Sequence, residues 1–329
     1  MSFILRRLGF YVVTAWVAIT LNFLIPRLMP GNPVQVLFSR IKHQISPAAV
    51  HAISLAFGLN TSQGLLGQYW SYLDQLFHGN LGVSVTYFPS TVSTVLRTAL
   101  PWTVALVGVA TVLSFVFGTM LGILSAWRRG SRTVDSLLPI TAFLSAVPYF
   151  WLGLVLLTVF AVELRWLPIA GGYSVDVTPG WTWEFISSAL VHGILPAATI
   201  VISSIAGWLL GMRNMMITTL AEDYVLLAEA KGLHQRRVLY TYAARNAILP
   251  NIASFALSLG FIVGGAILTE IVFSYPGIGY VLFQAVSNND YPLMQGVFLI
   301  ITFMVLLANL LADVCYVVLD PRTRESDRR

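Results

Sequence analysis

The sequence predicts an all-α membrane protein with six transmembrane helices. Of the 329 residues, 57% are hydrophobic and only 10% are charged, whereas an ordinary soluble domain carries about 25% charged residues. A helix needs about 20 residues to cross a hydrocarbon core of about 30 Å. Six hydrophobic blocks reach that length: 8–28, 101–127, 136–162, 194–220, 249–273 and 294–319. A simple soluble fold is therefore excluded.

The first block is expected to remain in the protein rather than to be removed as a secretory signal. Arg6 and Arg7 precede it, as in a signal peptide. It runs past Leu24, however, and ends in Pro26-Arg27-Leu28-Met29-Pro30 instead of the small residues of a cleavage site. We therefore expect residues 1–28 to contain the first transmembrane helix.

The positions of the basic residues predict that both chain ends are cytoplasmic. With six spans and the N-terminus inside, 14 of the 19 lysines and arginines lie on the inner side, where the positive-inside rule retains them. The outer side keeps Arg27, Arg40, Lys42, Arg97 and Arg165. The pI of about 9.4 is thus explained by topology, and no nucleic-acid partner is expected.

Neither a metal site nor an ATP site is expected in this chain, which is therefore predicted not to be an enzyme. Its single cysteine, Cys315, lies in the last block, and its five histidines show no ligand spacing. Its two lysines, Lys42 and Lys231, do not follow a Gly-x4-Gly sequence, so there is no phosphate-binding loop. No bound cofactor is expected, and energy for any active process must come from another chain.

Residues 29–96 are predicted to form an extracytoplasmic helical insertion after the first helix. The segment is too polar to span a membrane and too long for a connector. Helix-like stretches cover Ser46 to Leu55 and Leu65 to Phe77, before Gly79-Asn80-Leu81-Gly82 breaks the pattern. We expect a membrane domain over 97–319, which contains helices two to six, and a cytoplasmic tail over 320–329.

Pairs of glycines spaced four residues apart recur inside the hydrophobic blocks. The pairs are Gly118 with Gly122, Gly207 with Gly211, and Gly260 with Gly264. This spacing lets helix backbones approach closely in a membrane, so packing is the expected role of all three pairs.

The inner loop over 220–247 predicts two helices joined by a glycine turn. Glu222 and Asp223 suit the positive start of a helix, and Gly232 after Lys231 suits its end. A second helix is expected to run to about Asn246. The small residues at the end of the first helix would let a partner close around it: Ala228, Ala230 and Gly232. A surface helix that merely links two spans is the alternative.

Short motifs recur in order along nearly the whole chain. The inner loop contains Asp223-Tyr224-Val225, Ala228-Glu229-Ala230-Lys231-Gly232-Leu233 and Arg245-Asn246-Ala247-Ile248-Leu249-Pro250. Other motifs are Leu28-Met29-Pro30-Gly31-Asn32-Pro33, Gly79-Asn80-Leu81-Gly82-x-Ser84, Val147 to Gly153, Thr269 to Gly279, Asp290-Tyr291-Pro292 and Leu319-Asp320-Pro321-Arg322. Together these motifs closely resemble those of dipeptide, oligopeptide and nickel ABC-transporter permeases.

The departures from that family's pattern are few. Leu226 and Leu227 stand where the broader superfamily has Glu and Ala, and Glu229 stands where this subgroup often has Arg. Asn32 and Asn80 replace acidic residues. These changes put in doubt which salt bridge would stabilise contact with an ATPase.

The resemblance implies a type I ABC importer permease fold in the bacterial cytoplasmic (inner) membrane. It implies a second homologous permease, two cytoplasmic ATPase subunits that bind ATP and Mg, and an extracytoplasmic substrate-binding protein. Di- or oligopeptides are the expected cargo, with nickel chelates or oligosaccharides as alternatives. The residues expected to contact the ATPase are Glu222, Asp223, Tyr224, Ala228, Glu229, Ala230, Lys231, Gly232 and Leu233.

An outer gate is expected where the fifth block ends. Pro276 and Gly277 would reverse the chain, and 278–287 would form a short helix beside the pore. Because the block follows the inner loop through Pro250, one continuous helix would transmit a push to this turn. The residues expected at the gate or pathway are Gly264, Gly265, Tyr275, Pro276 and Gly277. A plain surface turn is the alternative.

A gradient-driven secondary transporter or channel and a membrane scaffold are the competing classes of function. Gradient-driven proteins place ionisable groups at mid-membrane. Here Glu270 and Asp313 lie toward the ends of their blocks, and Arg213 lies near the inner face. The importer interpretation is therefore favoured.

Overall fold

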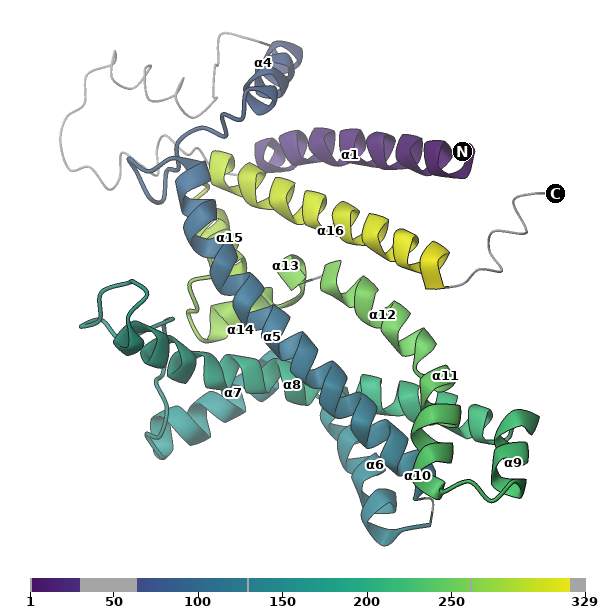
Figure 1. Ribbon diagram of the computed structural model, residues 1–329. Helices are drawn as coiled ribbons and strands as arrows, with labels where there is room; N and C mark the ends of the chain where they lie inside the picture. The colour runs from purple at the N-terminus through teal and green to yellow at the C-terminus, as the bar shows by residue number, and fades with distance from the viewer. Residues whose placement is uncertain (1, 30–63, 129, 261, 320–329) are drawn as a thin grey trace. The chain divides into compact units, whose positions relative to one another are not determined.

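The computed structural model describes residues 2–29, 64–128, 130–260 and 262–319, whose regular structure is helical apart from an isolated bridge between Val83 and Thr91. The chain divides into two compact units. The first contains residues 1–103 and 276–307, and the second contains residues 104–275 and 308–329. The predicted helix over 46–55 and the predicted tail over 320–329 lie outside the described residues. Figure 1 labels the helices.

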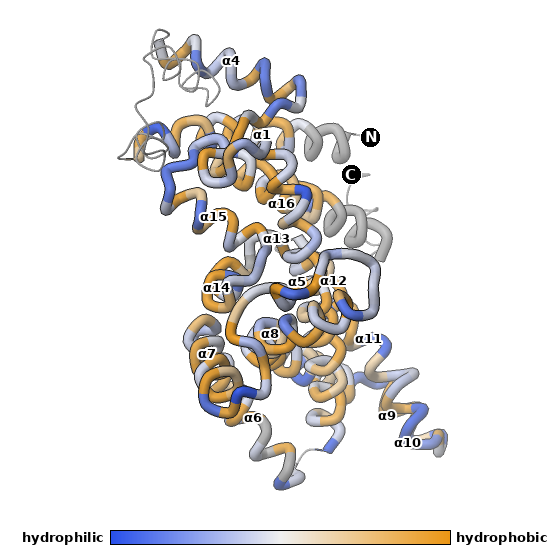
Figure 2. The backbone as a smooth tube through the Cα atoms, turned by 90° about the vertical axis from the view of Figure 1, so that its left-hand side faces the viewer, coloured by the Kyte–Doolittle hydropathy of each residue, from blue (hydrophilic) through white to orange (hydrophobic). Residues whose placement is uncertain are grey.

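Four described helices are long and hydrophobic enough to cross a membrane. They are α1 (Ser2–Leu28, of which Gly9–Leu28 qualifies), α5 (Val92–Trp127), α8 (Trp183–Leu220) and α16 (Tyr291–Leu319, of which Tyr291–Leu310 qualifies). They correspond to the first, second, fourth and sixth predicted blocks, and α5 and α8 begin several residues earlier than predicted. Hydrophobic residues run along all four in Figure 2.

The third predicted block, 136–162, is a bent pair of helices rather than a straight span. It contains α6 (Arg132–Ala146), α7 (Tyr149–Leu156) and the π-helix η1 (Leu157–Glu163). The axes of 138–146 and 149–163 meet at 99°. The bend follows from Pro148, because proline disfavours helical dihedrals at the residue before it, and Val147 is extended with φ −74° and ψ 128°. This pair is a fifth span if both halves cross together.

The expectation of one continuous helix over the fifth block is wrong. The described helices there are α12 (Leu249–Gly260) and α13 (Ile262–Gly265), on either side of residue 261, which is not described, and α14 (Ile267–Val272), which follows a break at Ala266. Glycine is a poor helix former, and the adjacent pair Gly264 and Gly265 precedes Ala266, whose φ of −117° and ψ of 19° leave the helical region. The described residues therefore hold four or five spans by length and composition, not six continuous ones.

In the first unit, α1 binds α4 (Leu65–Phe77), which confirms the helix predicted over the same residues. The Phe23 ring lies between Tyr69 and Tyr72, with centroids 5.1 and 5.6 Å away. Thr20 Oγ1 hydrogen-bonds to the Tyr69 hydroxyl at 2.7 Å, and Arg27 Nε donates to Gln68 Oε1 at 3.2 Å. The helix α4 is thus fixed to α1 by aromatic contact and polar bonds together.

A buried carboxylate organises the start of α16 in the same unit. Asp290 is fully buried, and its Oδ2 accepts from Ser84 Oγ at 2.5 Å and from the Thr86 N–H at 2.8 Å. Its Oδ1 accepts from the Leu293 N–H at 3.1 Å. The Asp290 side chain therefore accepts hydrogen bonds from the loop after α4 and from the first turn of α16. An acidic cap is favourable at the start of a helix.

In the second unit, α5 and α8 lie in backbone contact at two glycines. A Cβ added at Gly118 would lie 2.8 Å from the Ile205 carbonyl oxygen, and one at Gly122 would lie 2.7 Å from that of Leu209. Likewise, a Cβ at Gly260 would overlap the Cβ of Ala308. The predicted packing role is confirmed for these three glycines, but it is wrong for Gly207, where an added Cβ would meet nothing within 4 Å.

Replacing Asp290 by alanine is expected to destabilise the protein. It leaves three hydrogen-bond donors without their acceptor, and each buried loss costs about 1–3 kcal/mol. The midpoint of thermal unfolding in detergent should fall by roughly 5 °C or more, and Ser84→Ala should lower it less. Asp176→Ala, at an exposed carboxylate, is the matched control; equal midpoints for Asp290→Ala and Asp176→Ala would contradict the role of Asp290.

Candidate functional site

The coupling segment, residues 220–247, has the predicted helix, turn and second helix. Its first helix is α9 (Asp223–Ala230), and its second is made of α10 (Gln235–Arg237), the π-helix η2 (Val238–Ala244) and α11 (Arg245–Ala247). In Figure 2 the residues of α10 are hydrophilic, whereas α9 combines hydrophobic and hydrophilic residues. The segment is thus a helical hairpin of mixed polarity.

The end of α9 is fixed by a glycine in the left-handed conformation, as predicted. Gly232 has φ +74°. The Gly232 N–H donates to the Glu229 carbonyl at 2.8 Å, and the Leu233 N–H donates to the Ala228 carbonyl at 3.3 Å. These two bonds make a Schellman motif, in which glycine avoids the steric cost of a Cβ. At the other end, Glu222 precedes the helix without a side-chain capping bond.

One side of α9 is buried against the second helix of the segment. Val225 and Ala228 form a buried cluster with Val238, and Leu233 packs at its edge. Asn246 Nδ2 also donates to the Tyr224 hydroxyl at 2.9 Å. The helix α9 is therefore held to both η2 and α11.

The second helix of the segment is in turn buried against α5 and α8. Leu239 and Ala243 of η2 share a buried cluster with Met212 and Met216 of α8. The α5 residue Ile123 belongs to the same cluster. The coupling segment thus packs closely against two long helices of its own unit.

The nine residues predicted to contact an ATPase do not share one face. Ala228 is buried, so it is not available to a partner, and Leu233 is half-buried. The other seven are exposed: Glu222, Asp223, Tyr224, Glu229, Ala230, Lys231 and Gly232.

Sequence reasoning missed two residues on the exposed side of α9. Leu226 is 50% exposed and Leu227 is 56% exposed. At 100° per residue they lie opposite the buried pair Val225 and Ala228, on the same side as Asp223 and Ala230. The positions of Val225 and Ala228 around the helix could have identified Leu226 and Leu227 as exposed. The hydrophobic side chains of the two leucines alone suggested that they are buried.

The residues predicted at the outer gate are mostly enclosed. Tyr275 is only 4% exposed, Gly277 is buried and Pro276 is half-buried. The Tyr275 N–H donates to the Glu270 carbonyl at 2.8 Å, and Glu270 is itself buried. Burial, and secondarily the Glu270 carboxylate, raises the pKa of the Tyr275 phenol to about 12.

A turn follows α14, and the short helix predicted over 278–287 is present. Ser274 has φ +46°, and α15 (Ile278–Ser287) begins directly after Gly277. The Ile278 N–H donates to Thr103 Oγ1 at 2.7 Å. Gly264 and Gly265 lie on α13, separated from the turn by α14.

Among the described residues, no group of three His, Cys, Asp or Glu side chains could hold a metal ion.

The comparisons with known proteins agree over nearly the whole chain. The family model for the binding-protein-dependent transport system inner membrane component matches residues 118–325. The di/tripeptide transport system permease protein of Pseudomonas aeruginosa is 34% identical, over 98% of this chain and 99% of its own length. The oligopeptide transport system permease protein of Bacillus subtilis is 33% identical, over 92% of each chain.

The dipeptide transport system permease protein of Escherichia coli is 34% identical, over 98% of this chain and 99% of its own length. The chain therefore belongs to the family of binding-protein-dependent transport system inner-membrane components, as a multi-pass transport subunit without an ATPase domain of its own.

Proposed function

We propose that this chain is a permease subunit of an ATP-driven importer for di- and oligopeptides and forms half of its translocation pathway. The peptide cargo is supported by relatives named for di-, tri- and oligopeptides, which favour peptides over nickel chelates or oligosaccharides. Membership of a binding-protein-dependent family disfavours the gradient-driven carrier.

The proposed complex contains a second homologous permease, two cytoplasmic ATPase subunits that bind ATP and Mg, and an extracytoplasmic binding protein. In this chain, six passes are made by α1, α5, the bent pair α6 to η1, α8, the broken span α12 to α14, and α16. Both termini are cytoplasmic, as the distribution of lysine and arginine favours.

The observation that carries the proposal is the exposed side of α9. Leu226 and Leu227 are exposed between Asp223 and Ala230, while Val225 and Ala228 hold the opposite side to η2. Burying a leucine side chain contributes about 1.5–3 kcal/mol, so two leucines on a rigid helix suit a hydrophobic cleft in a partner. A helix that merely linked two spans would gain nothing from this exposure.

A second observation supports contact between the insertion and a binding protein. The helix α4 has an apolar stripe, defined as Leu66, Trp70 and Phe77, which is exposed. The stripe residues lie within one narrow arc of the helix, and Tyr69 and Tyr72 hold a neighbouring face to α1. The stripe therefore suits a protein partner on the outer side.

Changing both leucines of α9 should release the ATPases. Leu226→Asp with Leu227→Asp is expected to abolish copurification of the ATPase subunits and to leave the amount of permease in the membrane unchanged, because both side chains are exposed. Tyr240→Asp, at a comparably exposed position on η2, is the matched control. Normal copurification with the double variant would contradict the assignment of α9.

Substitutions at Gly232 should separate backbone conformation from side-chain bulk. Gly232→Asn is expected to retain most transport, because asparagine tolerates a positive φ. Gly232→Trp is expected to abolish transport while insertion stays normal, because the positive φ strains a tryptophan at this turn and the ring would obstruct a partner, whereas nothing else of this chain lies within 4 Å of the added Cβ. Wild-type transport rates with Gly232→Trp and bound ATPases would show that this turn does not couple the two subunits.

Changes in the apolar stripe of α4 should weaken the response to the binding protein. Leu66→Ser, Trp70→Ser and Phe77→Ser together are expected to lower ATP hydrolysis stimulated by the loaded binding protein by about tenfold, with basal hydrolysis retained. Leu65→Ser, an exposed leucine on another side of α4, is the control. Equal loss of basal and stimulated hydrolysis would indicate a folding role instead.

A further inference from the structure

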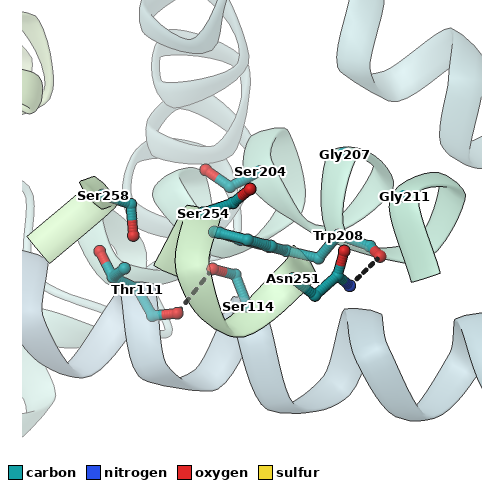
Figure 3. A pocket seen from close by; sticks show the side chains of 9 residues that line it. All are labelled: Thr111, Ser114, Ser204, Gly207, Trp208, Gly211, Asn251, Ser254 and Ser258. Carbon is teal, nitrogen blue, oxygen red and sulfur yellow. Dashed lines mark hydrogen bonds between the residues drawn. The ribbon is translucent and has the colours of Figure 1, made fainter. Parts of the chain in front are cut away.

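A pocket of about 460 Å³, called the polar pocket here after the polar side chains in its lining, lies between α5, α8 and α12, entirely within the second unit (Figure 3). Five hydroxyl side chains, one asparagine carboxamide, one tryptophan and two glycines line it, and none of these residues is charged. Its volume falls in the range of small-molecule sites. These polar side chains interrupt the surfaces of three helices that are otherwise mostly hydrophobic.

Several polar groups of this lining have no partner within the described part of the chain. Ser114 and Ser258 donate to backbone carbonyls of their own helices, at 3.0 and 2.7 Å. Ser204 and Ser254 make no such bond, and Figure 3 shows their hydroxyls on the same side of the Trp208 ring. A hydroxyl without a partner is costly in hydrocarbon, so this surface suits a polar occupant or water rather than lipid.

The carboxamide of Asn251 supplies a buried acceptor at the same place. The side chain is only 6% exposed. Its Nδ2 donates to the Trp208 carbonyl at 3.4 Å, which orients the group, and no described residue donates to its Oδ1. The pocket therefore offers two hydroxyl donors and one fixed acceptor.

The Trp208 ring is held as a rigid wall of the pocket. It meets Phe115 edge to face, with centroids 5.3 Å apart, and Phe255 at 6.3 Å. Phe115 and Phe255 stack on each other at 4.3 Å. A planar group in the pocket would thus find a fixed aromatic ring beside its hydrogen-bonding partners.

We infer that this pocket is a subsite for the main-chain amide groups of a peptide in transit. A peptide unit is planar and neutral, accepts through its carbonyl and donates through its N–H. It can therefore accept from Ser204 or Ser254, donate to Asn251 Oδ1 and lie against Trp208. Because the lining carries no charge, the subsite recognises the peptide backbone and not the charge of its side chains. This inference rests on the proposed peptide import.

Gly207 provides a way to fill the pocket without disturbing the helices. It lines the pocket, and a Cβ added there meets nothing within 4 Å, in contrast to Gly118 and Gly122 at the contact of α5 with α8. Leucine is also a better helix former than glycine, so Gly207→Leu should fold. Gly193, on the same helix, likewise has open space around an added Cβ but does not line the pocket.

The test measures peptide transported per ATP hydrolysed by the complete complex in proteoliposomes, with its binding protein and trialanine. Gly207→Leu should lower this ratio at least tenfold and retain ATP hydrolysis stimulated by the binding protein, whereas Gly193→Leu should leave the ratio unchanged. Ser204→Ala with Ser254→Ala should lower it about threefold. In Gly207→Leu, the ratio for Ala-Lys-Ala and for Ala-Glu-Ala should fall by the same factor as the ratio for trialanine.

The outcomes separate this inference from the proposed function. If the wild-type complex transports none of the three peptides, peptide import itself is wrong. If the wild type transports the peptides and Gly207→Leu has the same ratio of transport to ATP hydrolysis, the subsite is wrong and peptide import stands. The same conclusion follows if Gly193→Leu lowers this ratio as much as Gly207→Leu does. A loss confined to one charged peptide would overturn recognition through the main chain.

Discussion

The close approach of α5 and α8 at Gly118 and Gly122 is the contact on which the functional parts of the second unit depend. Without these glycines, a Cβ would come within 3 Å of the facing backbone carbonyl. Where lipid offers no hydrophobic drive for association, helices gain from such dense contact. The same pair of helices also provides the buried surface of Met212, Met216 and Ile123, onto which the coupling segment packs.

This arrangement changes how a movement of the coupling segment would reach the pathway. A continuous fifth helix is not available, because the chain leaves the helical conformation at Ala266, between α13 and α14. The packed route instead runs from α9 through Val238 to η2, and from Leu239 to α8. Since Gly207 and Gly211 of the polar pocket lie on α8 within two turns of Met212, the same rigid helix joins the coupling segment to the proposed subsite.

The first unit is held together by a different kind of interaction. Its helices meet through aromatic rings, as around Phe23, and through a buried carboxylate, as at Asp290. A buried polar side chain is stable only when it is hydrogen-bonded, and Asp290 accepts three hydrogen bonds. The helix α4 is fixed to α1 by one face, and its apolar stripe on the neighbouring face is exposed. Such a stripe is a suitable basis for the proposed docking surface.

The sequence by itself determined the features that depend on local chemistry. Hydrophobic length gave the long helices, Gly232 after Lys231 gave the end of α9, and the Ser274 to Gly277 turn gave the start of α15, because each depends on dihedral preferences of neighbouring residues. Ordered motifs also determined the family.

Only the tertiary structure decided which side of each helix is covered. Ala228 is buried while Leu226 and Leu227 are exposed, because η2 lies on one side of α9. Gly118 packs and Gly207 opens onto a pocket, although both are glycines in hydrophobic spans with a second glycine four residues later. Periodicity defines a face of a helix, but the physical position of its neighbours decides whether that face meets protein, a solute or solvent.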